Sequence, residues 1–198
     1  MPAPPAMPPE PLEWWTACFA YEGVARELVA RAKYRNQRRF LALVAHAVAL
    51  ATEPAPAVID VITWAPASAA RVRAHGVDHG ELLARAVARI TETPVASCLL
   101  RAPGPPQTGL DAAARRRGPW LRAAESVSVR VSGATVLVVD DVATTGGTLA
   151  ASARALRADG AQTVFGATIA RTPRPGAGRG RPPYTPPTPV GIRAHETQ

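Results

Sequence analysis

Residues 134–148 have the sequence ATVLVVDDVATTGGT, which predicts a buried strand, two carboxylates and a loop of small residues, in that order. The run Val136–Val139 is continuously apolar and mostly β-branched, as expected of a strand that is covered on both faces in a parallel sheet. Asp140 and Asp141 would lie at the carboxyl end of this strand, where open α/β sheets bind their ligands.

The residues that follow the two carboxylates predict an anion-binding loop. They combine small side chains, hydroxyl groups and a flexible glycine pair, and a helical pattern begins near Leu149. Such a loop directs free backbone N–H groups and the positive end of a helix dipole toward an anion. The candidate phosphate-binding residues are Ala143, Thr144, Thr145, Gly146, Gly147 and Thr148.

Two other interpretations fit part of the same run. An apolar strand that ends in aspartates also occurs in P-loop ATPases, but these need a GxxxxGK[ST] loop, and the only lysine in this chain is Lys33. The structural alternative is a turn that merely caps a helix. Adjacent carboxylates repel each other unless cations or hydrogen-bond donors attend them, so capping alone explains less of the sequence.

The run resembles the phosphoribosyl pyrophosphate (PRPP) binding motif of type I phosphoribosyltransferases. In that family the acidic pair contacts the ribose hydroxyls and the Thr/Gly loop holds the 5′-phosphate. The resemblance therefore implies Asp140 and Asp141 as the catalytic pair and residues 143–148 as the 5′-phosphate loop. It also implies that Mg²⁺ enters with PRPP, without protein side chains as direct metal ligands.

Two further segments narrow the resemblance to the ComF family of phosphoribosyltransferase-like proteins, which are associated with competence and DNA uptake. They are APASAARVRAHGVDHGELLA at residues 65–84 and QTGLDAAARRR at residues 107–117. The chain lacks the N-terminal Cys-based zinc module that many members carry. It also departs from the family pattern at His75, Val77, Asp78 and His79, where Arg, Phe, Asn and Gln are usual, and at Gly118, where Asn is usual.

Arginines and small residues outside the main motif supply further candidates. A predicted loop after the strand at 58–63 would hold pyrophosphate, because small residues let backbone N–H groups approach and an arginine offers a bidentate donor. An arginine after a strand, or a run of them, is equally typical of a solvated surface. The candidate pyrophosphate-binding residues are Ala67, Ser68, Ala69, Ala70 and Arg71, and those of the flexible loop that covers the site in transferases are Arg101, Arg115, Arg116 and Arg117.

Strands that alternate with helical segments predict one α/β domain, with the type I phosphoribosyltransferase fold that the resemblance implies. The sheet should be mainly parallel, flanked by helices, with a small helical cap at residues 23–50. The expected helices are 23–34, 38–50, 80–90 and 149–158, and the expected strands beside the central one are 58–63, 95–100, 127–131 and 163–170. The predicted boundaries are a Pro-rich disordered N-terminus at 1–13, the domain at 14–170 and a basic Pro/Gly-rich disordered tail at 171–198.

Composition limits the classes of function. The formal net charge is +8, and residues 171–198 hold five Arg and one Glu, so that +4 belongs to the tail and only +4 to the rest of the chain. This balance suits a domain that binds a small polyanion. Cys18 and Cys98 stand 80 positions apart and predict neither a disulfide framework nor a metal knuckle. Since the sequence has neither a membrane-length apolar run nor a signal peptide, we expect a cytoplasmic protein without membrane contact.

Two functions from different classes remain open. The first is phosphoribosyl transfer from PRPP to a nitrogen acceptor with release of pyrophosphate. The second is a non-catalytic DNA-uptake factor that binds single-stranded DNA or a nucleotide together with competence proteins. Two local alternatives also stay open: His75 and His79 have a spacing that zinc could use, without an evident third ligand, and Trp14 and Trp15 either stack on bases or, as we favour, pack against the core.

Overall fold

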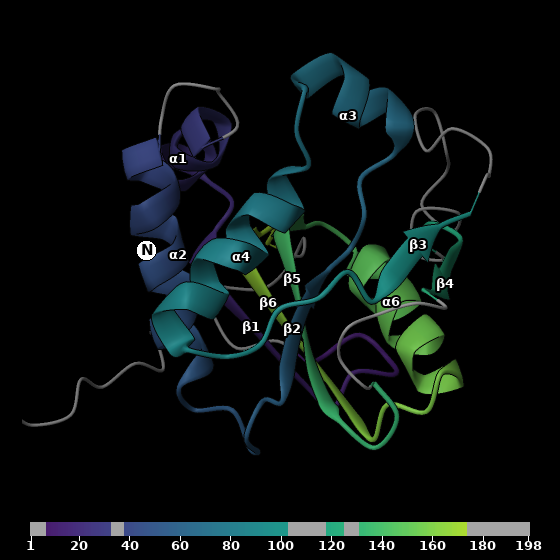
Figure 1. Cartoon of the computed structure of the whole chain (residues 1–198). Coiled ribbons are helices and arrows are strands. Elements are labelled where there is room, and N and C mark those ends of the chain that lie inside the picture. Colours follow the sequence, from purple (N-terminus) through teal and green to yellow (C-terminus); the bar gives the residue numbers. More distant parts are fainter. Residues whose placement is uncertain (1–6, 33–37, 103–117, 125–130, 174–198) are drawn as a thin grey trace, which may run out of the picture.

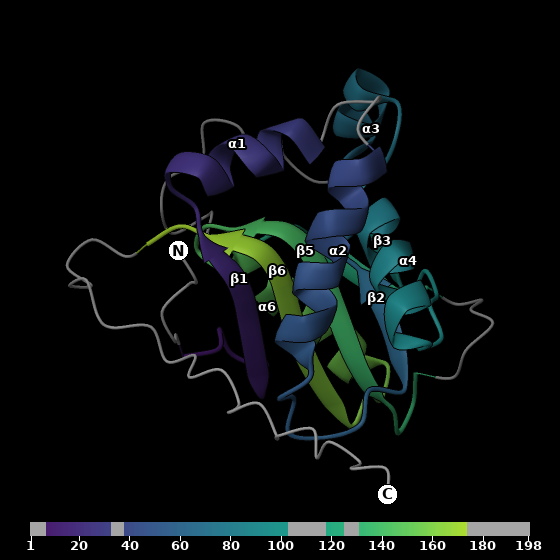
Figure 2. The ribbon, with the colours of Figure 1, turned by 90° about the vertical axis from the view of Figure 1, so that its left-hand side faces the viewer.

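A four-stranded parallel sheet in the order β1-β6-β5-β2 forms the centre of the protein. The computed structural model describes residues 7–32, 38–102, 118–124 and 131–173. The strands of the sheet are β1 (Trp14–Ala20), β2 (Val61–Trp64), β5 (Thr135–Ala143) and β6 (Thr163–Arg171). All neighbouring pairs are parallel, which confirms the predicted mainly parallel sheet and brings the carboxyl ends of the strands to one edge (Figures 1 and 2).

Helices cover both faces of this sheet. One face carries α2 and α4, and the opposite face carries α6 together with a two-stranded antiparallel hairpin, β3 and β4 (Figures 1 and 2). The helices are α1 (Gly23–Ala32), α2 (Arg38–Thr52), α3 (Ala69–His75), α4 (His79–Thr91) and α6 (Gly147–Ala158), and the hairpin strands are β3 (Leu99–Arg101) and β4 (Leu121–Ala123).

Two apolar clusters hold the layers together. Side chains of α2 and α4 pack against Leu137 and Phe165 on one face of the sheet. Side chains of α6 and the hairpin pack against Val136 and Val138 on the other. The whole run Val136–Val139 is fully buried, as the sequence predicted for a strand covered on both faces.

The predicted helical cap is divided between two positions. The second of its helices, α2, buries Val44 and Val48 against the sheet and therefore belongs to the core rather than to a cap. Of these two helices, it is α1 that lies across the end of the sheet at which the strands terminate (Figure 2). Trp14 and Trp15 pack inward, with the ring of Trp14 edge-on to Phe165 at a centroid distance of 5.7 Å.

Several boundaries differ from the predicted ones. The sequence did not predict β1, a half-buried strand that pairs with β6. The strand expected at 95–100 is divided, because Val95 forms a single parallel bridge with Ile62 and Leu99–Arg101 joins the antiparallel hairpin. The strand expected at 127–131 lies mostly outside the described residues. Within the described ranges no helix has both the length and the apolar character needed to cross a membrane.

The N-terminal segment is packed further back than the predicted boundary at residue 13. Leu12 is buried, its N–H donates to the Pro9 carbonyl at 3.0 Å, and the Glu13 N–H donates to the Val164 carbonyl at 3.2 Å. Glu13 also accepts the Val164 N–H at 2.8 Å and forms an ion pair with Arg157. These contacts join residues 9–13 to the domain.

Candidate functional site

The two adjacent carboxylates lie near the carboxyl end of β5, as predicted. Asp140 and Asp141 are both half-buried. The Asp141 N–H donates to Asp140 Oδ1 at 2.8 Å, and the Val142 N–H donates to Asp141 Oδ1 at 2.6 Å. Each carboxylate is thus oriented by the backbone of the residue that follows it.

The environment of Asp140 opposes its negative charge. Burial, and after it the neighbouring charge of Asp141, raise the pKa of Asp140 to about 8. The positive charge of Arg71 acts in the opposite direction without compensating. A cation close to the pair would offset this penalty.

The predicted anion loop connects β5 directly to α6. Ala143 ends the strand, residues 144–146 form a bend, and α6 begins at Gly147, two residues earlier than expected. Gly146 has φ +76°, a left-handed conformation that favours glycine. The Gly147 N–H donates to Thr145 Oγ1 at 3.3 Å. The loop therefore forms the N-terminus of a 12-residue helix, where the helix dipole favours an anion.

Both glycines of this loop are in contact with distant parts of the chain. A Cβ atom added to Gly146 would lie 2.8 Å from Pro9 Cγ and 3.0 Å from Pro9 Cβ. Gly118 has φ +74°, and a Cβ atom there would collide with the Gly147 carbonyl group and lie 3.1 Å from Ala151 Cβ. The N-terminal segment and the residues that precede β4 therefore both pack closely against the start of α6.

The predicted pyrophosphate loop is shorter than residues 67–71. Ala67 and Ser68 lie in the connection after β2, but Ala69–Arg71 form the first turn of α3. Ser68 is the N-cap of that helix, and its Oγ accepts the Arg71 N–H at 3.3 Å. The prediction of a loop failed here because three alanine and arginine residues after a serine N-cap have high helix propensity.

Asp78 fastens this connection to α4. Its Oδ2 accepts the Ala67 N–H at 2.8 Å, while its Oδ1 accepts the N–H groups of Gly80 at 2.9 Å and Glu81 at 3.4 Å. Sequence reasoning treated Asp78 only as a departure from the ComF pattern. An aspartate followed three residues later by a glutamate is a helix N-terminus signal and could have identified the cap, although not the bond to Ala67.

Arg101 brings the hairpin to the same end of the sheet. Its Nη1 donates to the Pro66 carbonyl at 3.3 Å. Burial and then the charge of Arg71 lower the pKa of Arg101, whereas Asp140 raises it. Three elements, α3, β3 and β5, thus contribute charges that act on one another. Arg115, Arg116 and Arg117 lie outside the described residues.

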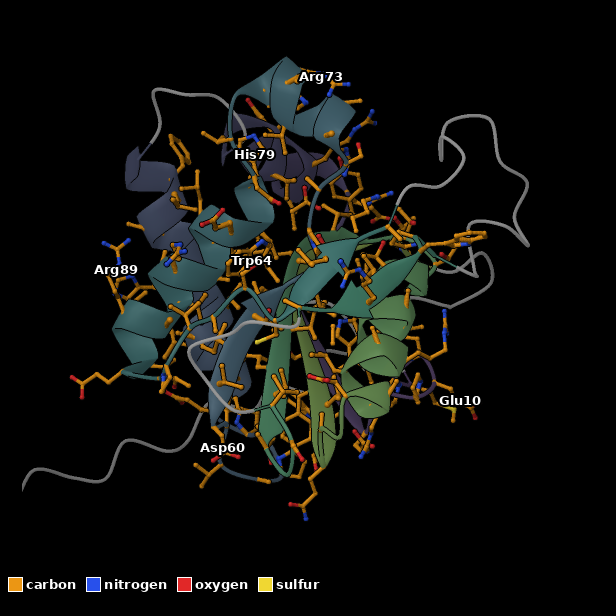
Figure 3. The ribbon with its side chains drawn as sticks, turned by 45° about the vertical axis from the view of Figure 1, so that its right-hand side comes forward. Glu10, Asp60, Trp64, Arg73, His79 and Arg89 are labelled. Carbon is orange, nitrogen blue, oxygen red and sulfur yellow. The ribbon has the colours of Figure 1, made fainter. Side chains whose placement is uncertain are left out.

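The histidine pair does not form part of a larger ligand cluster. The rings of His75 and His79 are edge-on, with centroids 5.7 Å apart. Within the described ranges no group of three or more His, Cys, Asp or Glu side chains could hold a metal ion. His79 and Arg73 lie at the end of the molecule where α3 stands, and Asp60 lies at the opposite end (Figure 3).

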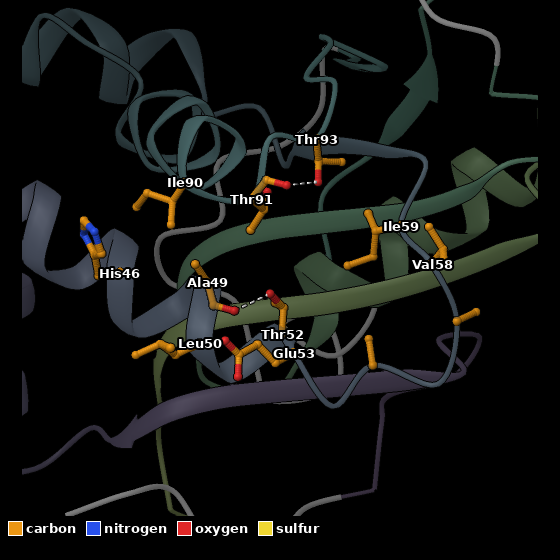
Figure 4. A pocket seen from close by; sticks show the side chains of 12 residues that line it. His46, Ala49, Leu50, Thr52, Glu53, Val58, Ile59, Ile90, Thr91 and Thr93 are labelled. Carbon is orange, nitrogen blue, oxygen red and sulfur yellow. Dashed lines mark hydrogen bonds between the residues drawn. The ribbon is translucent and has the colours of Figure 1, made fainter. Parts of the chain in front are cut away.

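A pocket of about 570 Å³ lies between α2, α4 and residues 53–59 (Figure 4). Neither Asp140 nor Asp141 lines it. Its threonine hydroxyls donate to backbone carbonyls, such as Thr52 to Ala49 at 2.6 Å and Thr93 to Thr91 at 3.3 Å. The exposed side chains of Leu50 and Val58 contribute to its apolar wall. Its other polar side chains are His46 and Glu53, and no residue of the β5–α6 loop lines it.

Comparison with known proteins agrees with this geometry. The phosphoribosyl transferase domain family matches residues 79–185, which is more than half of the chain. The chain therefore belongs to this family, and its parallel sheet flanked by helices is the type I phosphoribosyltransferase fold. No curated protein matches the chain.

Three solved structures illustrate the similarity. Glutamine PRPP amidotransferase from B. subtilis, complexed with ADP and GMP, is 21% identical with a TM-score of 0.46, covering 71% of this chain and 30% of that one. A hypothetical protein from Neisseria gonorrhoeae with bound ppGpp is 17% identical with a TM-score of 0.46, covering 73% and 74%. Purine phosphoribosyltransferase from Pyrococcus horikoshii is 16% identical with a TM-score of 0.43, covering 68% and 84%. The chain thus spans less than a third of the amidotransferase.

Proposed function

We propose that the chain binds PRPP with Mg²⁺ and transfers its phosphoribosyl group to a nitrogen acceptor, with release of pyrophosphate. The observation that carries this proposal is the continuous unit of β5, Asp140, Asp141 and a glycine-containing loop at the start of α6. Arg71 and Arg101 support it, because the charge of each interacts with that of Asp140. The two arginines also lie close enough to act on each other.

Each part of the substrate has a matching group in this proposal. Asp140 and Asp141 accept hydrogen bonds from the ribose hydroxyls, and residues 143–148 hold the 5′-phosphate through backbone N–H and hydroxyl groups. The segment Ala67–Arg71 holds pyrophosphate, although the Ala67 N–H is already engaged by Asp78. Arg101, with Arg115, Arg116 and Arg117, belongs to the segment that covers the site.

The reaction would break the bond between C1 of the ribose and pyrophosphate and form a bond from C1 to the acceptor nitrogen, which then releases its proton. Mg²⁺ supplies positive charge that offsets the pyrophosphate and the carboxylate pair. The protein contributes by positioning PRPP and by stabilising the departing pyrophosphate with fixed positive charge. The pKa of Asp140 is raised to about 8. Its carboxyl group must therefore lose a proton before it can interact fully with a cation.

The second candidate is a ComF-type, non-catalytic factor that binds single-stranded DNA or a nucleotide and contacts competence proteins. The observation that favours it is Trp120, which directly precedes β4 and is 68% exposed, with the exposed Arg122 two residues further along the chain. An exposed aromatic ring beside a cation is suited to stacking on nucleobases. For either function we propose a cytoplasmic location, a domain at residues 14–170 to which residues 9–13 are joined, and a tail at residues 171–198.

A direct experiment separates the two candidates. The chain is incubated with PRPP, Mg²⁺ and a panel of purine and pyrimidine bases while pyrophosphate release is measured, and binding of a labelled single-stranded oligonucleotide is followed by fluorescence anisotropy. Base-dependent pyrophosphate release supports the transferase. Oligonucleotide binding that Trp120→Ala weakens, without pyrophosphate release from any base, supports the uptake factor.

A further inference from the structure

We propose that the N-terminal segment Pro9–Glu13 is a brace for the 5′-phosphate loop and that Pro9 is a positioning residue for phosphate binding. The inference rests on the proposed function, because it assigns a second support to the same loop. It starts from one contact: the three heavy atoms nearest to the Cβ position of Gly146 all belong to Pro9, the closest at 2.8 Å.

The brace is anchored at its far end. Leu12 is buried with only 6% exposure, and its Cδ2 lies 2.7 Å from the Cβ position of Gly166 in β6. Glu13 is bonded to both the N–H and the carbonyl of Val164 and is paired with Arg157 near the end of α6. The segment therefore contacts Val164 near the amino end of β6, Arg157 near the end of α6 and the loop at the start of that helix.

Rigidity makes this contact useful to the loop. The ring of Pro9 fixes its own φ, and the Pro9 carbonyl accepts the Leu12 N–H at 3.0 Å, which ties Pro9 to the buried Leu12. Gly146 is left-handed and belongs to a loop whose N–H groups must point at an anion. A loop held in its binding conformation loses less entropy when phosphate binds, and it binds more tightly as a result.

The contact can be tested without any ligand. Gly133 has φ +77° and open space at its Cβ position, whereas Gly146 has φ +76° and faces Pro9, so the two glycines form a matched pair. Gly146→Ala should lower the melting temperature more than Gly133→Ala does. In a Pro9→Gly background the difference between the two alanine variants should disappear. An unchanged difference in that background would overturn the contact.

The positioning role is tested with two ligands that engage different parts of the site. Calorimetric titrations with ribose 5-phosphate and with pyrophosphate are compared for the wild type, Pro9→Gly and Pro8→Gly. Pro8 is also half-buried and serves as the control for the added backbone freedom of glycine. We expect Pro9→Gly to weaken ribose 5-phosphate binding by about three- to tenfold, with pyrophosphate binding unchanged and Pro8→Gly like the wild type.

The possible failures are distinguishable. Equal ribose 5-phosphate affinity in the wild type and Pro9→Gly would overturn the positioning role and leave the proposed function intact. An equal loss for both ligands would also overturn it, since that is the signature of general destabilisation. A wild type that binds neither ligand would overturn the proposed function and the positioning role together, while the melting comparison would still decide whether Pro9 braces the loop.

Discussion

Replacing Asp140 with asparagine should stabilise the fold at alkaline pH. The pKa of Asp140 is raised from 3.8 to about 8, mainly by burial and then by the charge of Asp141. Because the folded-state pKa lies above the unfolded value, the folded state binds more protons between these two pH values, and the free energy of unfolding falls as pH rises through that window. The amide of asparagine stays neutral, so the variant should not show this decline.

The expected size of the effect follows from the same displacement. A difference of about four pH units corresponds to ~6 kcal/mol as an upper bound, at ~1.4 kcal/mol per unit. Asp140 is only half-buried, and its raised pKa depends in part on the charge of Asp141, so we expect ~1–3 kcal/mol. For a protein of this size ~2 kcal/mol raises the melting temperature by ~4–8 °C.

The assay is thermal unfolding followed by circular dichroism from about pH 4 to about pH 9, without ligand. The two proteins should melt at similar temperatures at the acid end, where the carboxyl of Asp140 is protonated in the folded wild type and, with an unfolded pKa of 3.8, close to half protonated in the unfolded chain. The variant should melt higher at the alkaline end. A constant offset between the two proteins at every pH would refute the argument, because burial of a titrating carboxyl could not then be its cause.

Three further substitutions test the surroundings of the site. Gly118→Ala should lower the free energy of unfolding by ~2–4 kcal/mol and Gly133→Ala by only ~1 kcal/mol in thermal unfolding. Both residues are left-handed, but only at Gly118 would the added Cβ also collide with a neighbour, so equal costs would contradict the contact. Gly147→Val should reduce PRPP affinity in calorimetry at least tenfold (~1.4 kcal/mol), and Thr172→Val should leave it unchanged. Asp78→Ala should lower the free energy of unfolding by ~1–3 kcal/mol, since it removes a helix cap, and it should weaken pyrophosphate binding, since it removes the bond to Ala67 after β2. Unaltered pyrophosphate affinity would exclude a role for the bond between Asp78 and Ala67 in the site.

The central motif was readable from the sequence because its signals are local. A continuously apolar run, two aspartates and a glycine pair each act within a few residues of their own position, and the observed β5, bend and α6 follow in the predicted order. The helix α6 begins two residues earlier than predicted, because Gly147 and Thr148 belong to its first turn. The mainly parallel sheet followed from the alternation of strands and helices.

The supports of the site were not readable, because each depends on contacts between distant segments. No pattern in the Pro-rich start indicates that Pro9 meets Gly146, or that Glu13 meets Val164, more than 100 positions further along the chain. The strand β1 lacks a clear apolar alternation and is defined by its pairing with β6. A loop was predicted at the first turn of α3, where the N-cap Ser68 instead starts a helix.

The most direct test of the account is calorimetric titration of the wild type and of the double variant Asp140→Asn/Asp141→Asn with PRPP in the presence of Mg²⁺. We expect one saturable site per chain in the wild type and no detectable binding in the double variant, with both proteins folded by circular dichroism. Absence of binding to the wild type, or equal affinity in the two proteins, would contradict the assignment of this carboxylate pair and loop to PRPP.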